Sequence, residues 1–213
     1  MLATITAVLD WLGIVAFAVT GALVASRKQM DIVGFALLAV VTGVGGGTLR
    51  DLLLGVAPVA WVREPASVVT CIAVAGVAFF TAHIPQSRFM WVLWLDAVGL
   101  AVFSVTGAET ALAAGASPFV AVVMGVVTAT FGGIIRDILG GESPIILRRE
   151  IYVTAALLGA LVFVAALSVG LGRDPAAVAG FLAALVLRCA ALERRWSLPR
   201  YRPRPARSYE QGH

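Results

Sequence analysis

The sequence has little charge and few of the residues that build common active sites. Asp, Glu, Lys and Arg make up 13% of its 213 residues, whereas a soluble domain is usually about 25% charged. It holds two histidines and two cysteines, and we find no metal-ligand cluster, Ser-His-Asp set or phosphate-binding loop. These absences argue against a soluble enzyme. We therefore predict no catalytic residues, no cofactor and no fixed metal site.

Hydrophobic residues dominate instead, at 60% of the chain, with a mean hydropathy of +0.96. Apolar runs near 20 residues recur, and each is long enough to cross about 30 Å of hydrocarbon. They do not alternate every second residue, as the strands of a membrane barrel would. We predict an all-α integral membrane protein with seven transmembrane helices, over residues 9–25, 32–54, 65–82, 90–114, 118–139, 151–169 and 176–192.

Two of these runs contain glycines followed by an Arg-Asp pair, at residues 43–51 and 131–137. Glycine costs a helix about 1 kcal/mol relative to alanine, and a charge near the bilayer centre costs about 2.5–3.5 kcal/mol. The second and fifth helices are therefore predicted to be broken at their glycines. Broken helices at corresponding positions of two halves indicate a binding or permeation site.

The chain contains an internal repeat with an offset of 86 residues. This offset matches charged and small polar residues as well as apolar ones: Asp10 with Asp96, Thr20 with Thr106, Thr42 with Thr128, Gly46-Gly47 with Gly132-Gly133, and Arg50-Asp51 with Arg136-Asp137. With three helices per repeat, the second repeat begins on the opposite side, so the repeats are inverted. We predict repeats over 1–86 and 87–172, an added seventh helix over 173–193, and a disordered basic cytoplasmic tail over 194–213.

The distribution of Lys and Arg predicts the orientation. Most lie at one side of the predicted spans, which we expect to be cytoplasmic, whereas Arg63 and Arg173 lie at the other. This arrangement places the N-terminus outside and the C-terminus inside. We expect the basic tail to contact anionic lipid headgroups and not nucleic acid.

The glycines and nearby hydroxyls are candidates for an ion pathway. Glycine peptides can turn away from a helix axis, and exposed carbonyls can replace part of a cation's hydration shell. The candidates are Gly45, Gly46, Gly47, Thr48, Gly132, Gly133, Thr20, Thr106 and Thr128, with K⁺ or Na⁺ bound transiently near the glycines. Alternatively, the glycines only let two helices cross closely, and the hydroxyls bond to their own helices.

The buried charges form a second candidate group. By depth, Asp10 is expected to pair with Arg50 near the outer side, and Asp96 with Arg136 near the inner side. The other candidates are the adjacent Asp51 and Asp137, and Glu109 as a third outer partner. These pairs are either structural clasps or part of the conduction pathway, and a pair at each mouth can serve as both clasp and gate.

The doubled G-G-x-x-R-D motif at 46–51 and 132–137, with the Gly-Glu-Ser-Pro of 141–144 and the Arg-Glu of 149–150, resembles the prokaryotic branch of the trimeric intracellular cation (TRIC) channels. The resemblance covers residues 5 to 190. It implies seven spans, a homotrimer with one pore in each protomer, and conduction of K⁺ and also Na⁺ across the inner (plasma) membrane. The alternative is a small-solute secondary transporter, because some bacterial relatives are assigned to glycine transport.

Overall fold

The computed structural model describes residues 5–84, 87–147 and 151–197, and every regular element there is a helix. Most of the predicted basic tail, together with Arg149 and Glu150 of the family motif, lies outside the described residues. The seven apolar helices are α1 (Ile5–Arg27), α2 (Ile32–Leu54), α4 (Ala66–Thr81), α5 (Arg88–Ala113), α6 (Pro118–Leu139), α7 (Val153–Ser168) and α8 (Arg173–Arg194). Two short helices, α3 (Ala60–Arg63) and η1 (Ile145–Leu147), lie in the connections after α2 and α6.

The predicted all-α membrane class is confirmed by these lengths and compositions. Five of the helices are long and apolar enough to cross a membrane, whereas α4 and α7 have 16 residues each. Sixteen residues rise about 24 Å at 1.5 Å per residue, which is less than the hydrocarbon thickness. The count of seven complete spans therefore stays a prediction.

The helix ends follow from local capping chemistry. The Asp31 carboxylate accepts a hydrogen bond of 2.8 Å from the amide of Gly34 and begins α2, as N-capping residues do. Gly55 ends the same helix with φ of 67°, a left-handed conformation that favours glycine. Ser117 caps α6, and Pro118 occupies its first turn, where a missing amide hydrogen costs nothing.

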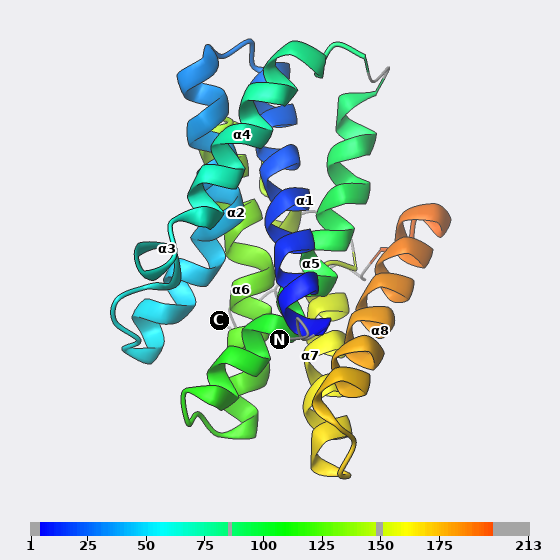
Figure 1. The fold of residues 1–213 in the computed structure, drawn as a ribbon. Helices are drawn as coiled ribbons and strands as arrows, with labels where there is room; N and C mark the ends of the chain where they lie inside the picture. Colours follow the sequence, from blue (N-terminus) through cyan, green and yellow to red (C-terminus); the bar gives the residue numbers. More distant parts are fainter. Residues whose placement is uncertain (1–4, 85–86, 148–150, 198–213) are drawn as a thin grey trace, which may run out of the picture.

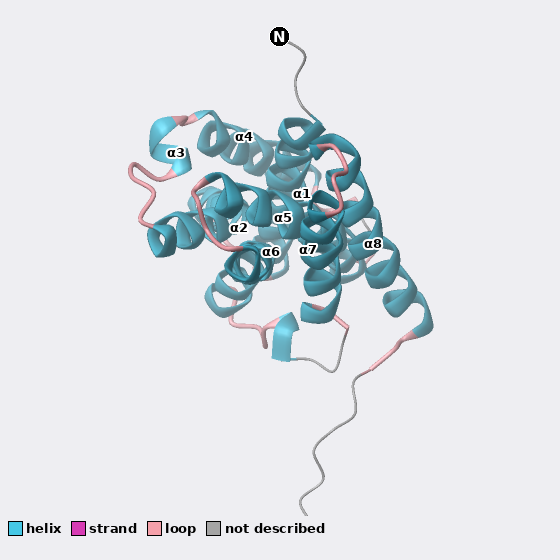
Figure 2. Cartoon of the chain, turned by 90° about the horizontal axis from the view of Figure 1, so that it is seen from below, coloured by secondary structure: helices cyan, strands magenta, loops and turns pink. Residues whose placement is uncertain are grey.

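The helices run alternately up and down through one bundle (Figure 1). In that view α1 ascends and α5 descends, while α2 descends and α6 ascends. Equivalent helices of the two repeats therefore run in opposite directions, as an inverted repeat requires. Seen along the bundle, α3 and α4 lie on one side and α8 on another (Figure 2).

The contact between α1 and α5 is reciprocal between repeat-equivalent residues. The rings of Phe17 and Phe103 meet edge to face, with centroids 5.1 Å apart. A Cβ added at Gly99 would lie 2.1 Å from the Phe17 ring, and one added at Gly13 would lie 3.1 Å from the Phe103 ring. Each phenylalanine therefore occupies the space that a glycine of the other repeat leaves free.

The crossing of α2 and α6 corrects the expectation that these helices are broken. Both are continuous through their glycines, and the backbones touch there. A Cβ at Gly46 would lie 2.1 Å from the Thr128 carbonyl oxygen, and one at Gly132 would lie 2.4 Å from the Thr42 carbonyl oxygen. The missing side chains thus admit the neighbouring helix, as in small-residue contacts between membrane helices.

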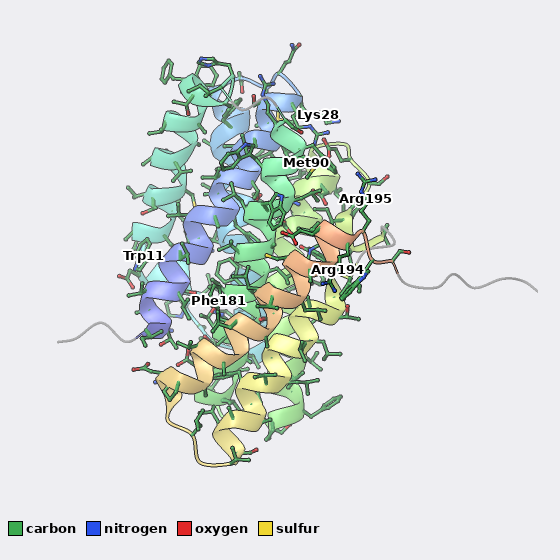
Figure 3. The ribbon with its side chains drawn as sticks, turned by 90° about the vertical axis from the view of Figure 1, so that its right-hand side faces the viewer. Trp11, Lys28, Met90, Phe181, Arg194 and Arg195 are labelled. Atoms are coloured by element: carbon green, nitrogen blue, oxygen red, sulfur yellow. The ribbon has the colours of Figure 1, made fainter. Side chains whose placement is uncertain are left out.

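One end of the bundle gathers basic residues. Figure 3 shows Lys28 and Met90 at this end. Here Arg27 Nη1 lies 3.1 Å, and Lys28 Nζ 3.9 Å, from Glu142 Oε1. The end of α1 and the connection after α6 are thereby joined by charge, at the side predicted to be cytoplasmic.

Candidate functional site

A polar cavity of about 130 Å³ opens between the first half of α1, the last half of α2 and the short helix α3. Five of the predicted site residues line it: Asp10, Gly47, Thr48, Arg50 and Thr128. Further lining comes from the polar Glu64 and Ser67, the aromatic Trp11, Trp61 and Phe103, and Ile14, Gly43, Val44 and Ala60. An apolar bundle that keeps two acids and an arginine at one cavity has the composition of an intramembrane site.

Arg50 is held at the cavity by its neighbour in sequence. Its Nε and Nη2 donate to Asp51 Oδ1 at 2.9 and 2.7 Å. The second oxygen of Asp51 accepts a bond of 2.8 Å from the amide of Ala60, the first residue of α3. Both side chains are buried, so Asp51 fixes the guanidinium and the start of the next helix together.

The second repeat forms the same arrangement around Arg136. Its Nε donates to Asp137 Oδ1 at 2.9 Å, and Asp137 Oδ2 accepts from the amide of Ile145, which begins η1. Arg136 Nη1 makes two further bonds, of 2.7 Å to Asp96 Oδ1 and 2.9 Å to Thr20 Oγ1. The structure thus forms the predicted Asp96–Arg136 pair, and α1, α5 and α6 meet at one guanidinium.

The corresponding outer pair is not formed. Asp10 shares the cavity with Arg50, but no ion pair joins them within 4.0 Å among the described residues. Instead, both Nε and Nη2 of Arg50 bond to Asp51. Thr106, the repeat equivalent of Thr20, also has a buried hydroxyl without a hydrogen bond in this part of the chain. The two repeats therefore differ, with one arginine clamped across the bundle and the other facing a cavity.

Glu109 also departs from its predicted role as a partner of Arg50. It bonds to Arg173, in the first turn of α8. The helix α5 packs against α8 as well as α6 and α1, and Glu109 is not among the residues that line the cavity. Glu109 therefore joins the seventh apolar helix to the second repeat.

Three of the predicted pathway hydroxyls donate to their own helices. Thr20, Thr48 and Thr128 bond to the carbonyl oxygens of residues 17, 44 and 124 at 2.8, 2.7 and 2.6 Å. This local bonding is the alternative set out above. A hydroxyl that donates backwards still has lone pairs, however, so Thr48 and Thr128 can present acceptor oxygens to the cavity.

Comparisons with known proteins relate the whole bundle to one family. A family model described as "Glycine transporter" matches residues 7–83 and 93–168. The two matches begin with the same offset that separates Arg50 from Arg136. The UPF0126 inner membrane protein YadS of Escherichia coli K12 is 42% identical over 192 residues, which are 89% of this chain and 92% of YadS. The UPF0126 membrane protein YvgT of Bacillus subtilis is 36% identical over 90% of this chain and 94% of YvgT.

Solved structures decide the family. The TRIC trimeric intracellular cation channel orthologue from Rhodobacter sphaeroides is 63% identical, with a TM-score of 0.89 over 91% of this chain and 100% of that chain. A second structure, described for conductance through TRIC cation channels, is 36% identical with a TM-score of 0.84, and the match covers 93% of this chain and 98% of that one. The chain belongs to the prokaryotic TRIC channel family.

The glycines of this TRIC family member are placed in different surroundings. Gly46 and Gly132 lie at the helix crossing, whereas Gly45 lines an apolar groove formed by α2, α3, α4 and α6. Gly133 faces the inner charge cluster, since its added Cβ would lie 3.4 Å from Asp96 Oδ1. Of the five predicted glycines, Gly47 alone lines the polar cavity.

Sequence reasoning missed two buried residues of this TRIC family member. Arg188 is fully buried in α8, and its Nη1 donates to the Ile151 carbonyl at 3.1 Å. An arginine inside the apolar run 176–192 was a usable signal, because buried charge in a membrane helix marks function or a specific partner. Tyr152 carried no such signal. Within the described residues, no group of three or more His, Cys, Asp or Glu could hold a metal ion.

Proposed function

We propose that this protein is a channel for monovalent cations, K⁺ and also Na⁺, with a pathway inside each protomer of a homotrimer. The observation that carries the proposal is the polar cavity, which α2 lines together with Trp61 of α3, Glu64 and Thr128 of α6. The solved relatives, described as trimeric intracellular cation channels, support the same activity and assembly.

The charge of the cavity favours cations over anions. Asp10 and Glu64 line it together with Arg50, but Arg50 is neutralised by Asp51, which faces α3. The remaining negative charge from two carboxylates raises the local concentration of cations and lowers that of chloride. With two acids, and without a closed ring of them, the cavity has no tight site for a divalent ion.

Discrimination between K⁺ and Na⁺ is expected to be weak. A strict potassium filter is built from stacked backbone carbonyls that replace the hydration shell. The α2 and α6 backbones are helical through their glycines, so their carbonyls bond within the helix. An ion passing this cavity keeps much of its water and meets carboxylate and hydroxyl oxygens.

We place a closed ion pair at the inner part of the proposed pathway. Arg136 and Asp96 are completely buried and joined by a bond of 2.7 Å, and Arg136 also bonds to Thr20 of α1. Passage of an ion past this point requires the pair to separate or to admit water. The inner pair is therefore proposed as the gate, and the outer cavity as the open vestibule.

Placement in the membrane completes the proposal. The basic end of the bundle is assigned to the cytoplasm by the excess of Lys and Arg, which puts the N-terminus outside. YadS is named as an inner membrane protein, which supports the same membrane for this chain. We also propose that the basic tail contacts anionic lipid headgroups.

Glycine transport is the competing function, because the matching family model carries that description. A glycine site needs backbone amides for the carboxylate and an acid for the ammonium group. The amides of residues 45–47 lie inside the continuous α2, so the structure offers less to the carboxylate than a broken helix would.

Proteoliposomes containing the purified protein separate the two functions. We expect K⁺ efflux down its gradient, independent of glycine, and reduced when Asp10 and Glu64 are both changed to the amides Asn and Gln. Glu142→Gln, at the basic end of the bundle, is the matched control and leaves the flux unchanged. Saturable glycine uptake without K⁺ flux would overturn the channel and assign the cavity to a transporter.

A further inference from the structure

The inner charge pair has companions that the outer half lacks. Tyr152 begins α7 and Arg188 lies in α8. The repeat offset places Ala66 opposite Tyr152, and α8 has no counterpart in the first repeat. Both residues are buried, with 2% of Tyr152 and none of Arg188 exposed. The inner half, which has these two extra residues, is also the half in which the predicted pair, Asp96–Arg136, is formed. The outer pair, Asp10–Arg50, is not formed.

The Tyr152 hydroxyl lies against the inner pair at Gly133. A Cβ at Gly133 would be 3.1 Å from Tyr152 Oη, 3.4 Å from Asp96 Oδ1 and 3.5 Å from Arg136 Nη2. Three polar groups from α5, α6 and the start of α7 therefore surround one small space. Because position 133 is a glycine, no side chain separates the hydroxyl from the ion pair.

This cluster is incompletely hydrogen-bonded. Within the part of the chain that the structure describes, Tyr152 Oη, Asp96 Oδ2 and Arg136 Nη2 are buried and make no hydrogen bond. Water that hydrogen-bonds to such buried groups stabilises them, because it removes the cost of leaving them without a partner. The closed pair is thus sensitive to side chains that keep water out, and the Tyr152 side chain lies against it at the start of α7.

Arg188 holds that ring from α8. Its guanidinium carbon lies 5.1 Å from the centroid of the Tyr152 ring, a cation–π distance that is most favourable when the cation is desolvated. Its Nη1 also bonds to the carbonyl of Ile151, the residue before the tyrosine. Ring and backbone at the start of α7 are therefore both held by one side chain of the helix that stands outside the repeat.

We propose that Tyr152, held by Arg188, is a positioning residue that keeps the Arg136–Asp96 pair closed and makes α8 part of the gate. The proposal rests on the channel function above. The ring excludes water from the pair, and a dry ion pair is much stronger than a hydrated one. When the ring is absent or released, water reaches the three unbonded atoms and the pair separates more often.

Single-channel recording in planar bilayers tests this proposal, with open probability and unitary conductance measured separately. We expect Tyr152→Ala and Arg188→Met each to raise open probability about tenfold, the effect of losing a desolvated cation–π contact. Unitary conductance should stay as in the wild type, because neither residue lines the outer cavity. Tyr152→Phe and Arg188→Lys keep the ring or the cation, and should restore most of the closure.

Two control variants separate gating from loosened packing. Phe163→Ala removes a fully buried ring from α7, the helix that Tyr152 begins. This phenylalanine packs on Gly180 of α8. Arg194→Met removes a cation at the end of α8, 5.4 Å from the centroid of the Trp196 ring that follows this helix. Neither should change open probability, although Phe163→Ala should lower the melting temperature.

The proposal is overturned if assembled Tyr152→Ala channels open as rarely as the wild type, or if Phe163→Ala raises open probability equally. An increase confined to Tyr152→Ala, with Arg188→Met unchanged, would contradict the role of α8. A wild-type protein without any current would instead refute the channel function itself, so the two failures are distinguishable.

Discussion

Replacing Gly46 by alanine should push α2 and α6 apart. The added Cβ would lie 2.1 Å from the Thr128 carbonyl oxygen, where 3.4 Å is ordinary contact, so the crossing must widen by about 1.3 Å. The obstacle is helical backbone and cannot rotate away as a side chain can. Overpacking typically costs about 1–3 kcal/mol, and a rigid backbone clash belongs at the upper end of that range.

Helix propensity opposes this loss of stability, because alanine favours the helix more than glycine does. Alanine gains up to about 1 kcal/mol over glycine inside a helix, which leaves a net loss of roughly 2 kcal/mol for Gly46→Ala. Gly76 is the matched control, because it lies within α4 and nothing is within 4 Å of its added Cβ. Gly76→Ala should therefore be neutral or stabilising, by up to about 1 kcal/mol.

The free energy of unfolding of both variants, measured by denaturant titration in mixed micelles, checks this difference. We expect Gly46→Ala to be less stable than Gly76→Ala by about 3 kcal/mol. Gly132→Ala, whose Cβ would lie 2.4 Å from the Thr42 carbonyl, should resemble Gly46→Ala. Equal stability of all three variants would refute the close crossing and restore the broken helices as an explanation for the glycines.

Three further predictions concern the charges. Asp96→Asn or Arg136→Gln alone should cost about 3–5 kcal/mol of stability, because each leaves a buried partner unpaired; the double variant should cost less than the sum, and additive losses in the cycle would exclude the pair. Glu109→Gln should cost no more than about 1 kcal/mol in thermal unfolding, since 58% of its partner Arg173 is exposed; a larger loss would show a stronger tie to α8. Asp51→Asn should weaken two charge-assisted bonds and cost about 1.5–3 kcal/mol, and unchanged stability would remove it as the clasp of its neighbouring arginine.

The helices could be predicted because hydropathy and capping act locally. A run of about 20 apolar residues has few alternatives to a membrane helix. Asp31, Gly55 and Ser117 then set ends that the structure reproduces within a few residues. The Asp96–Arg136 pair was accessible for a related reason, since equal depth in an inverted repeat brings the two charges to one level of the bundle.

The remaining features depend on the rotation of each helix about its axis, which depth does not determine. Glu109 lies near the predicted depth of Arg50 but bonds to Arg173 of α8. Arg50 bonds to its sequence neighbour Asp51 and not to Asp10. Likewise, a glycine in the sequence does not reveal whether its own helix breaks there or a neighbouring helix approaches closely. At Gly46 it admits a neighbour.

Cation selectivity remains the most direct test of the proposed function. The measurement is the reversal potential of the purified protein in a planar bilayer with a tenfold KCl gradient. A pathway lined by Asp10 and Glu64, with Arg50 neutralised, predicts a potential close to that of K⁺, about 59 mV in magnitude for a monovalent ion. It also predicts little change when Na⁺ replaces K⁺ on both sides. A potential near zero, or one of the opposite sign, would contradict a cation-selective pathway through this cavity.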